Sequence, residues 1–425
     1  MSRRAGRART PAAPQSPHNA NPVGKGLRRT RSVRPTTVPP PLSAAGAGKV
    51  RLGDVCEEVS VRNRDGKVSS VCSVTNSEGF IPSTEYFSKE VYSKSLATYK
   101  IVKPGMFAYN PSRINVGSVN RWIGEAPVIV SPLYIVVNPD PRRIEGSYLN
   151  YFLHSKEALC QIRNLTEGTV RDSLKFSGFQ RLTLPLPPLP TQQRIADELD
   201  RLCALKKNAE DRLAILDQIV KSRFVEMFGG GCLSDEKQLF SEICEFVTVG
   251  IANSATHVYA ESGVPMLRNQ NIREGSLDDS DLVHIKSEFA EKYRSKTLKE
   301  NDLLIVRTGY PGVSCVVPKK YEGAQTFTTL IARLRDLDET DPVFVCHYLN
   351  SPYGKEYVDK SKVGIAQQNF GARALEGMPI FIPHISLQRE FAAFVAEVDK
   401  SKLTLRETVA TLDQLYRAKL QEYFG

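Results

Sequence analysis

Two stretches of the chain carry the same spacing of hydrophobic residues. Along residues 191–228 and again along 386–424, positions separated alternately by four and three residues are apolar at eight of ten steps. The two exceptions in each stretch are basic and fall at the same two steps. A 3.5-residue period sustained in both copies favours a coiled coil over an ordinary amphipathic helix packed on its own domain. The first frame contains Ile195, Leu199, Leu202, Lys206, Ala209, Leu213, Leu216, Val220, Arg223 and Met227, and the second Phe391, Val395, Val398, Lys402, Leu405, Val409, Leu412, Tyr416, Lys419 and Tyr423.

The two predicted helices are copies of one segment. Each follows an apolar, proline-bearing strand, enters through Gln-Arg, passes through Leu-Asp-Gln and stops at Phe-Gly. The copies are 195 residues apart at Gln193 and Gln388 but 196 apart at Leu216 and Leu412, a slip of one residue. An internal repeat of this kind predicts two tandem structural units.

Residues typical of helix ends bound the two stretches. Thr191 and Ser386 fall at matching positions and predict N-caps. Gly229 follows the last periodic residues of the first copy and predicts the C-terminal end of that helix.

A globular segment precedes each helix, and the two segments resemble each other weakly. Lys103 and Lys299 each lead into an apolar, β-like run and a loop with Gly or Pro, and they lie 196 residues apart. The apolar run 126–137 predicts a further strand. We therefore expect an α/β (α+β) protein in which two globular domains alternate with two long helices that pack as an antiparallel coiled coil. The expected division is a tail at 1–48, globular domains at 49–189 and 231–385, and spacer helices at 190–230 and 386–425.

The excess positive charge lies at the N-terminal end of the chain. The formal net charge is +10, and residues 1–50 hold ten Lys or Arg and no Asp or Glu. Removing those ten from the 57 basic residues leaves 47 basic against 47 acidic, so bulk charge does not by itself indicate that the folded body binds DNA. The Arg- and Pro-rich segment 1–48 predicts a disordered tail, which either adds non-specific attraction to phosphates or is a dispensable extension.

Sequence signatures of catalysis and metal binding are missing. No Walker-type loop and no Gly-x-Ser-x-Gly elbow occurs, and Asn-Pro-Asp-Pro at 138–141 lacks the aromatic residue of a methyltransferase motif. No two of the eight cysteines are spaced as Cys-x-x-Cys, and the six histidines form no cluster. We therefore expect no catalytic residue, metal or cofactor in this chain. Scattered cysteines and the lack of an apolar run of roughly 20 residues indicate a soluble, cytoplasmic protein.

The order of globular domain, proline-bearing strand, Gln-x-Arg-Ile-Ala helix and terminal Phe-Gly, repeated once, resembles the specificity subunit of type I DNA restriction–modification enzymes. LPLPPLPTQQRIADELD at 184–200 carries most of the resemblance, and the segments 102–119 and 298–314 resemble target recognition domains of that family. The second spacer departs from the pattern, because His384-Ile385 replaces Pro-Leu.

The resemblance implies a non-catalytic, DNA-binding subunit in which each target recognition domain reads one half of a bipartite, asymmetric site. It implies two methyltransferase (modification) subunits and restriction subunits as partners, with S-adenosylmethionine, ATP and magnesium bound by those partners. The alternatives are a coiled-coil scaffold that does not bind DNA and an enzyme with a divergent active site. The polar loops before each spacer favour a DNA-binding subunit over a scaffold, and the missing catalytic motifs disfavour an enzyme.

Base reading requires side chains that present paired donors and acceptors: Arg or Lys for guanine, and Asn or Gln for adenine. Such side chains gather in loops at similar places of the two units. Candidates in the first unit are Tyr109, Asn110, Ser112, Arg113, Asn115, Thr169, Arg171 and Lys175. Candidates in the second are Arg268, Asn269, Gln270, Asn271, Arg307, Thr308, Tyr310, Gln367, Gln368 and Asn369.

Overall fold

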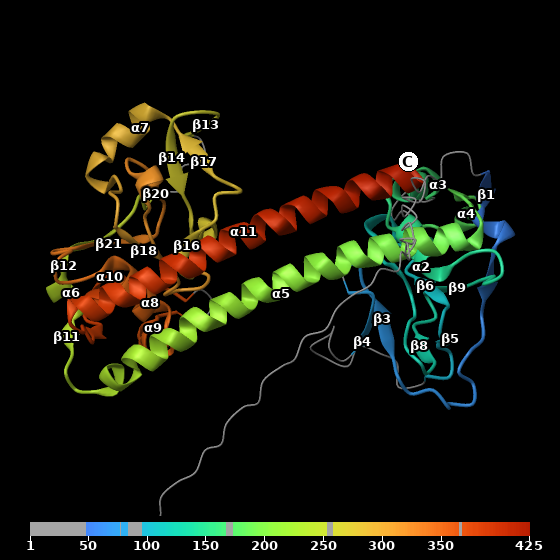
Figure 1. Ribbon diagram of the computed structural model, residues 1–425, viewed down its shortest axis with the longest axis horizontal. Helices are drawn as coiled ribbons and strands as arrows, with labels where there is room; N and C mark the ends of the chain where they lie inside the picture. The colour runs from blue at the N-terminus through green and yellow to red at the C-terminus, as the bar shows by residue number, and fades with distance from the viewer. Residues whose placement is uncertain (1–47, 77, 84–95, 167–172, 253–257, 365–367) are drawn as a thin grey trace, which may run out of the picture. The chain divides into compact units, whose positions relative to one another are not determined.

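Two long helices dominate the architecture of the computed structural model, which describes residues 48–425 except 77, 84–95, 167–172, 253–257 and 365–367. Helix α5 spans Leu189–Leu233 and helix α11 spans Ile385–Phe424, and they lie side by side (Figure 1). Lys206 pairs with Asp413 while Asp217 pairs with Lys402, so the helices run antiparallel, as the sequence predicts. At 1.5 Å per residue, the 45 residues of α5 extend about 68 Å.

The hydrophobic frame predicted from the sequence is the face along which the helices pack. Every position of both frames is buried or half-buried. All four basic positions of the frames form ion pairs with an acidic residue of the opposite helix, which fixes the register of packing. These pairs are Lys206–Asp413 at 2.9 Å, Lys402–Asp217 at 2.7 Å, Arg223–Glu390 at 3.2 Å and Lys419–Glu198 at 3.3 Å.

Three of the four predicted helix ends are wrong, whereas α11 ends at Phe424, directly before Gly425, as the sequence predicts. Helix α5 begins after Pro188 and α11 after His384, so Thr191 and Ser386 lie inside the first turns rather than at the N-caps. Gly229 does not end α5, which continues to Leu233 because Phe228 and Cys232 on that turn are buried in the core. Glycine in this turn permits close packing instead: a Cβ on Gly231 would come within 2.3 Å of the Phe381 ring.

A buried glutamine joins the first turn of each long helix to the segment before it. The Gln192 side chain accepts a hydrogen bond from the Glu145 amide (2.8 Å) and donates to the carbonyls of Arg143 (3.1 Å) and Pro187 (2.8 Å). Gln388 makes the same three bonds with Asp341, Glu339 and Pro383, at 2.8, 3.1 and 2.7 Å. Each partner is displaced by 196 residues, so Gln192, not Gln193, is the counterpart of Gln388 and the one-residue slip is an error of the sequence alignment.

Replacing Gln192 with alanine should lower the free energy of unfolding by about 2 kcal/mol, because three backbone groups in buried or partly buried hydrogen bonds lose their partner. Gln193 supplies a matched control, since its side chain is exposed and, among the described residues, bonds only to the half-buried Asp197 of the same helix. Urea denaturation of Gln192→Ala and Gln193→Ala measures both effects. Equal destabilisation by the two variants would contradict the role assigned to Gln192.

The first lobe, described within residues 48–188, is built on a four-stranded antiparallel sheet in the order β2-β9-β6-β7. The run 126–137, predicted as one strand, is divided by a turn between β8 and β9. The strands are β1 (Lys49–Arg51), β2 (Cys56–Val59), β3 (Cys72–Val74), β4 (Phe80–Pro82), β5 (Lys100–Val102), β6 (Phe107–Tyr109), β7 (Val119–Arg121), β8 (Val128–Val130), β9 (Ile135–Pro139) and β10 (Thr183–Pro185), and the helices are α2 (Gly146–Leu153), α3 (Lys156–Leu165) and α4 (Phe176–Phe179).

The second lobe, described within residues 234–384, repeats that sheet as β12-β21-β18-β19 and adds a second four-stranded sheet, β13-β17-β14-β20. Its strands are β11 (Gln238–Leu239), β12 (Cys244–Val249), β13 (Tyr259–Ala260), β14 (Val264–Leu267), β15 (Ile272–Arg273), β16 (Ser276–Leu277), β17 (Val283–Ile285), β18 (Leu303–Ile305), β19 (Ser314–Val316), β20 (Gln325–Thr326), β21 (Leu330–Leu334) and β22 (Pro379–Ile380). Its helices are α6 (Phe240–Ile243), α7 (Ser287–Lys292), α8 (Pro342–Asn350), α9 (Pro352–Ser361) and α10 (Ala372–Glu376).

Each lobe packs on the start of one long helix and the end of the other. Phe228 near the end of α5 packs on Phe344 of α8 with ring centroids 4.9 Å apart. Phe424 at the end of α11 packs on Tyr148 of α2 at 5.0 Å, and both residues of this pair are displaced by 196 from the first pair. The 196-residue repeat is therefore present in the packing of the lobes on the helices as well as in the sequence. Among the described residues, no helix is both long and apolar enough to cross a membrane.

Candidate nucleic-acid interface

In the first lobe, the loop after β6 carries the most accessible of the predicted base-reading residues. The Asn110 side chain accepts a hydrogen bond from the Ser112 amide (3.1 Å) and so holds the turn that leads into the short 3-10 helix Ile114–Val116. Arg113 and Ser112 are exposed on this turn, and Asn115 is half-buried. Such a turn can present an arginine to a DNA groove while its backbone remains fixed.

A second segment joins that loop. The Leu174 amide donates to the Pro111 carbonyl (3.0 Å), which brings the exposed Lys175, at the N-cap of α4, to the same region. Two parts of the chain that are 63 residues apart in sequence thus meet in one loop region. Thr169 and Arg171, which were predicted to belong to it, lie outside the described residues.

Tyr109 is not available to DNA, and its predicted role is wrong. It ends β6 with 0% of its surface exposed and stacks on Phe179 with centroids 5.3 Å apart. Burial raises the pKa of its phenol, and the hydroxyl has no partner among the described residues. Tyr109 is a core residue of the strand, and the accessible loop begins at Asn110.

In the second lobe, three separate candidate segments converge. The Asn269 side chain donates to the Thr308 hydroxyl (3.2 Å), and the Tyr310 hydroxyl donates to the Asn269 carbonyl (2.6 Å). Thr308 forms a β-bridge with Asn369. Phe370, the next residue, donates its amide to the Arg307 carbonyl (2.9 Å). The sequence predicts these residues as separate loops, and the structure gathers them into one surface, here called the second reading surface: Arg268, Asn269, Arg307, Thr308, Tyr310 and Asn369.

The same backbone bond organises both lobes. The Leu174–Pro111 bond and the Phe370–Arg307 bond join residues displaced by 196. The side chains at these positions differ, because Pro111 stands where the second lobe has Arg307. The two lobes therefore share a frame but present different chemistry.

Some candidates of the second lobe are occupied by contacts within the loop. Asn271 is 1% exposed, and its side chain accepts from the Arg268 amide (2.9 Å) and donates to the Asp278 carbonyl (2.9 Å). Its predicted role in base reading is wrong, because it braces the loop instead. Arg268 forms an ion pair with Asp281 at 2.9 Å, and the exposed Gln270 donates to the same carboxylate.

Three buried atoms of the second reading surface have no hydrogen-bond partner among the described residues: the Nε of Arg268, the Nε of Arg307 and the Oδ1 of Asn369. Buried polar atoms without a partner are rare, because each loses its hydrogen bonds to water. A ligand that supplied an acceptor to Arg307 and a donor to Asn369 would satisfy both. Gln368 is exposed beside them, and Gln367 lies outside the described residues.

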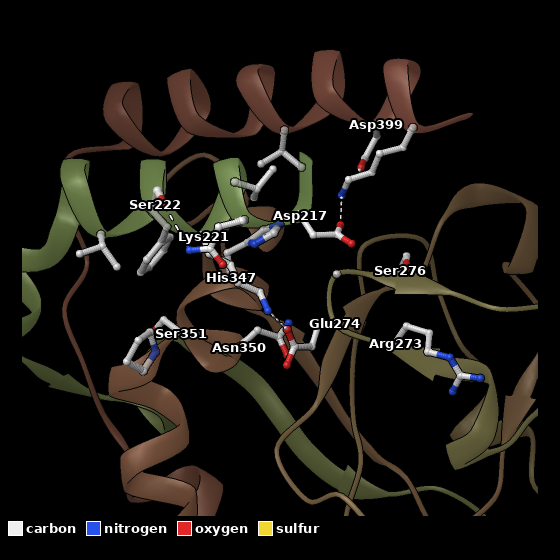
Figure 2. A pocket seen from close by; sticks show the side chains of 18 of the residues that line it. Asp217, Lys221, Ser222, Arg273, Glu274, Ser276, His347, Asn350, Ser351 and Asp399 are labelled. Atoms are coloured by element: carbon white, nitrogen blue, oxygen red, sulfur yellow. Dashed lines mark hydrogen bonds and ion pairs between the residues drawn. The ribbon is translucent and has the colours of Figure 1, made fainter. Parts of the chain in front are cut away.

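A cleft that the sequence did not predict lies between the long helices and the second lobe (Figure 2). It has a volume of about 1060 Å³ and receives residues from α5, α11, α8, α9 and the β15–β16 hairpin. Glu274 of the hairpin pairs with Lys221 of α5 at 2.7 Å and with Lys355 of α9. Burial alone would raise the pKa of Glu274, but hydrogen bonds from the two lysines lower it below its ordinary value. No sequence motif predicted this site, because its residues come from five elements.

His347 of α8 lines the cleft, and burial together with the nearby Lys402 lowers its pKa to about 4. An unfolded histidine titrates near 6.5, so between about pH 6.5 and 4 the unfolded chain binds a proton that the folded chain does not. Stability should therefore fall as pH is lowered through this window. Urea midpoints at pH 7 and pH 5 should differ more for the wild type than for His347→Gln, and equal differences would contradict this assignment.

The described residues include no group of three or more His, Cys, Asp or Glu side chains placed to hold a metal ion.

Comparisons with known proteins agree with this arrangement. The family model described as "Type I restriction modification DNA specificity domain" matches residues 47–214 and 236–414. The specificity subunit of the type I restriction enzyme EcoKI from Escherichia coli strain K12 is 22% identical over 312 residues, which are 68% of this chain and 67% of that protein. The MjaVIII specificity subunit from Methanocaldococcus jannaschii is 23% identical over 372 residues, 82% of this chain and 85% of that protein.

Solved structures share the fold. A chain from a structural study of complex assembly and conformational transition of the type I R-M system matches 88% of this chain and 97% of its own length, with a TM-score of 0.55 and 16% identity. The S subunit of a type I restriction–modification system from M. genitalium matches 94% of this chain and 98% of its own, with a TM-score of 0.51 and 12% identity. At such identities, the likeness concerns the fold alone.

Proposed function

Because the chain belongs to the family of type I restriction modification DNA specificity domains, we propose that it selects the DNA sequence on which a restriction–modification complex acts. Its role is recognition, and the chemical steps belong to other subunits. Residues 49–189 form the first target recognition domain and residues 231–385 the second. Each domain reads one half of a bipartite site, and the halves differ because the domains differ in their loop side chains.

The observation that carries this proposal is the repeated loop pair. The Leu174–Pro111 and Phe370–Arg307 bonds place polar loops at equivalent positions of the two lobes. Arg113 is exposed in the first loop pair, and the second contains the open hydrogen-bonding atoms of Arg307 and Asn369. Arginine and asparagine are the side chains that pair with the edges of guanine and adenine in the major groove.

The helix pair gives the spacing that a bipartite site requires. Half-sites one helical turn apart are about 34 Å from centre to centre, and α5 extends about 68 Å. Interhelical ion pairs and the apolar face that the two helices share make the pair a stiff connector rather than a flexible linker. A stiff connector favours a fixed separation between the halves.

The partners are DNA and the remaining subunits of a type I complex. We infer two methyltransferase subunits, because the 196-residue repeat gives the helix pair two pseudo-equivalent halves on which like subunits can bind. Restriction subunits join through that assembly. S-adenosylmethionine, ATP and magnesium belong to these partners, and we propose a cytoplasmic location because the DNA to be methylated lies there.

Selection from random-sequence duplex DNA tests the proposal. The purified chain with its methyltransferase partner should enrich two short, unlike motifs at one separation, and the partner alone should enrich neither. Failure of the complex to enrich any sequence would contradict the proposal and favour a coiled-coil scaffold that does not bind DNA.

A further inference from the structure

The hairpin formed by β15 and β16 connects the second reading surface to helix α5. The loop Asn269–Asn271 runs directly into β15, and the turn of the hairpin carries Glu274 and Gly275. Figure 2 shows Glu274 in the cleft with Lys221 from α5 and His347 from α8. Glu274 is therefore three residues from the reading loop and in direct ionic contact with the spacer helix.

The turn of the hairpin is held so that Glu274 cannot swing freely. The Gly275 amide donates to the Ser314 carbonyl of β19 at 2.9 Å. Gly275 has a φ of +73°, and a Cβ at that position would lie 3.4 Å from the His347 ring. On the other side of the hairpin, Asn271 bonds to the Asp278 carbonyl. A displacement of Glu274 relative to α5 would consequently be transmitted to the reading loop.

Glu274 adds an ionic contact to the apolar contact between lobe and helices. The apolar contact is the core around Phe224, Phe344 and Phe391, and it forms one wall of the cleft, where Phe224 is a lining residue. The apolar core determines where the second lobe contacts the helices. A single contact constrains the tilt of the lobe on the helices less well than two contacts do. The Glu274–Lys221 pair provides that second contact.

Among the described residues, the first lobe keeps the carboxylate of this connection but not its ionic partners. Glu78 is the counterpart of Glu274 after 196 residues, but it is exposed and forms no ion pair with either long helix. The counterpart of Lys221 after 196 residues is Arg417, which pairs with Asp413 on its own helix at 2.7 Å. The counterpart of Lys355 is Leu159, which carries no charge. His347 of the cleft is replaced by Tyr151, whose ring packs against Tyr416 with centroids 6.3 Å apart. The ionic bridge is thus a property of the second lobe rather than of the repeat.

We propose that Glu274 is a positioning residue that, through Lys221, fixes the tilt of the second reading surface on helix α5 and so restricts the separation at which both half-sites are read. This inference rests on the proposed function. Glu274 acts through Lys221 and not by contact with DNA, so the bases preferred within each half-site do not depend on it.

Replacing Glu274 with glutamine should broaden the range of separations that the complex accepts. Binding is measured on duplexes that contain both half-sites with the natural separation or with one base pair added or removed. The ion pairs are partly exposed and therefore individually weak, so discrimination against the altered separations should fall about 3- to 10-fold. Base preference within each half-site should remain that of the wild type.

Three further variants make the test specific. Lys221→Gln breaks the bridge to the helix and should broaden the accepted separations as Glu274→Gln does. Lys355→Gln leaves that bridge intact and should change them less. Glu356→Gln removes a neighbouring charge of α9 whose ion pair, within the described part of the chain, is with Lys360 on the same helix, and it should have no effect.

The outcomes separate this inference from the proposed function. Unchanged discrimination in both Glu274→Gln and Lys221→Gln would overturn the positioning role while leaving bipartite reading intact. Equal weakening at every separation would overturn it as well, because it would show a general effect on folding or affinity. A wild-type complex that recognises no bipartite site would instead contradict the proposed function itself.

Discussion

Replacing Phe224 with alanine should lower the free energy of unfolding by about 3–5 kcal/mol, the largest effect on stability expected here. Phe224 is 2% exposed and lies where α5, α11 and α8 meet. Its ring centroid is 5.2 Å from that of Phe228, 5.4 Å from Phe391 and 5.7 Å from Phe344. Truncation removes the apolar surface of the ring and leaves a cavity that three different elements cannot close together.

Urea denaturation followed by circular dichroism measures this effect. Ile215→Ala provides the control, because Ile215 is an apolar residue of the same helix with 58% of its surface exposed, and its loss should change stability by less than about 1 kcal/mol. Similar losses in the two variants would contradict the aromatic core as the joint between lobe and helices.

The long helices were predictable because their packing is encoded locally. A 3.5-residue period marks the buried face whatever the rest of the chain does, and the basic interruptions could be assigned to the same frame. The ion pairs that these basic residues form with Asp413, Asp217, Glu390 and Glu198 could not be predicted. They depend on the register between two helices that are far apart in sequence.

Helix ends were less predictable, because tertiary contacts override local preference there. Gly229 favours termination, but Phe228 and Cys232 are buried on either side of it and hold the turn in the helix. The alignment of Gln193 with Gln388 failed for a related reason. Adjacent glutamines look alike in sequence, and only the three buried bonds of Gln192 identify the true counterpart.

The candidate interface was predictable as loops and only partly as residues. Polar residues near Gly and Pro indicated the loops correctly. The sequence does not show which side chains are buried, as those of Tyr109 and Asn271 are. The open atoms of Arg307 and Asn369 depend on how three loops converge. The Glu274 bridge gave no sequence signal, because a lone carboxylate and two lysines in separate elements form no motif.

Replacing Arg307 with alanine should relax base preference in one half-site only. Its guanidinium belongs to the second reading surface, and its Nε lacks a partner among the described residues. Losing a bidentate contact to a base costs about 1–3 kcal/mol of discrimination, or roughly 5- to 150-fold between the right and wrong base. Arg294→Ala is the control, because Arg294 is an exposed arginine of the same lobe that pairs with Glu291 outside the reading surface.

Arg113→Ala should produce the reciprocal change. Arg113 is exposed on the loop of the first lobe, whose frame matches that of the second through the Leu174–Pro111 bond. Loss of its contact should relax the other half-site to a similar degree. If either arginine contacted only phosphate, its loss would weaken binding to all sequences alike.

A base-preference profile over both randomised half-sites, measured for the wild type, Arg113→Ala and Arg307→Ala in complex with the methyltransferase partner, determines whether each lobe reads one half-site. We predict that each substitution relaxes one half-site, that the two affected halves differ, and that the untouched half keeps its wild-type preference. Relaxation of both halves to the same extent by either substitution would contradict the assignment of one reader to each lobe.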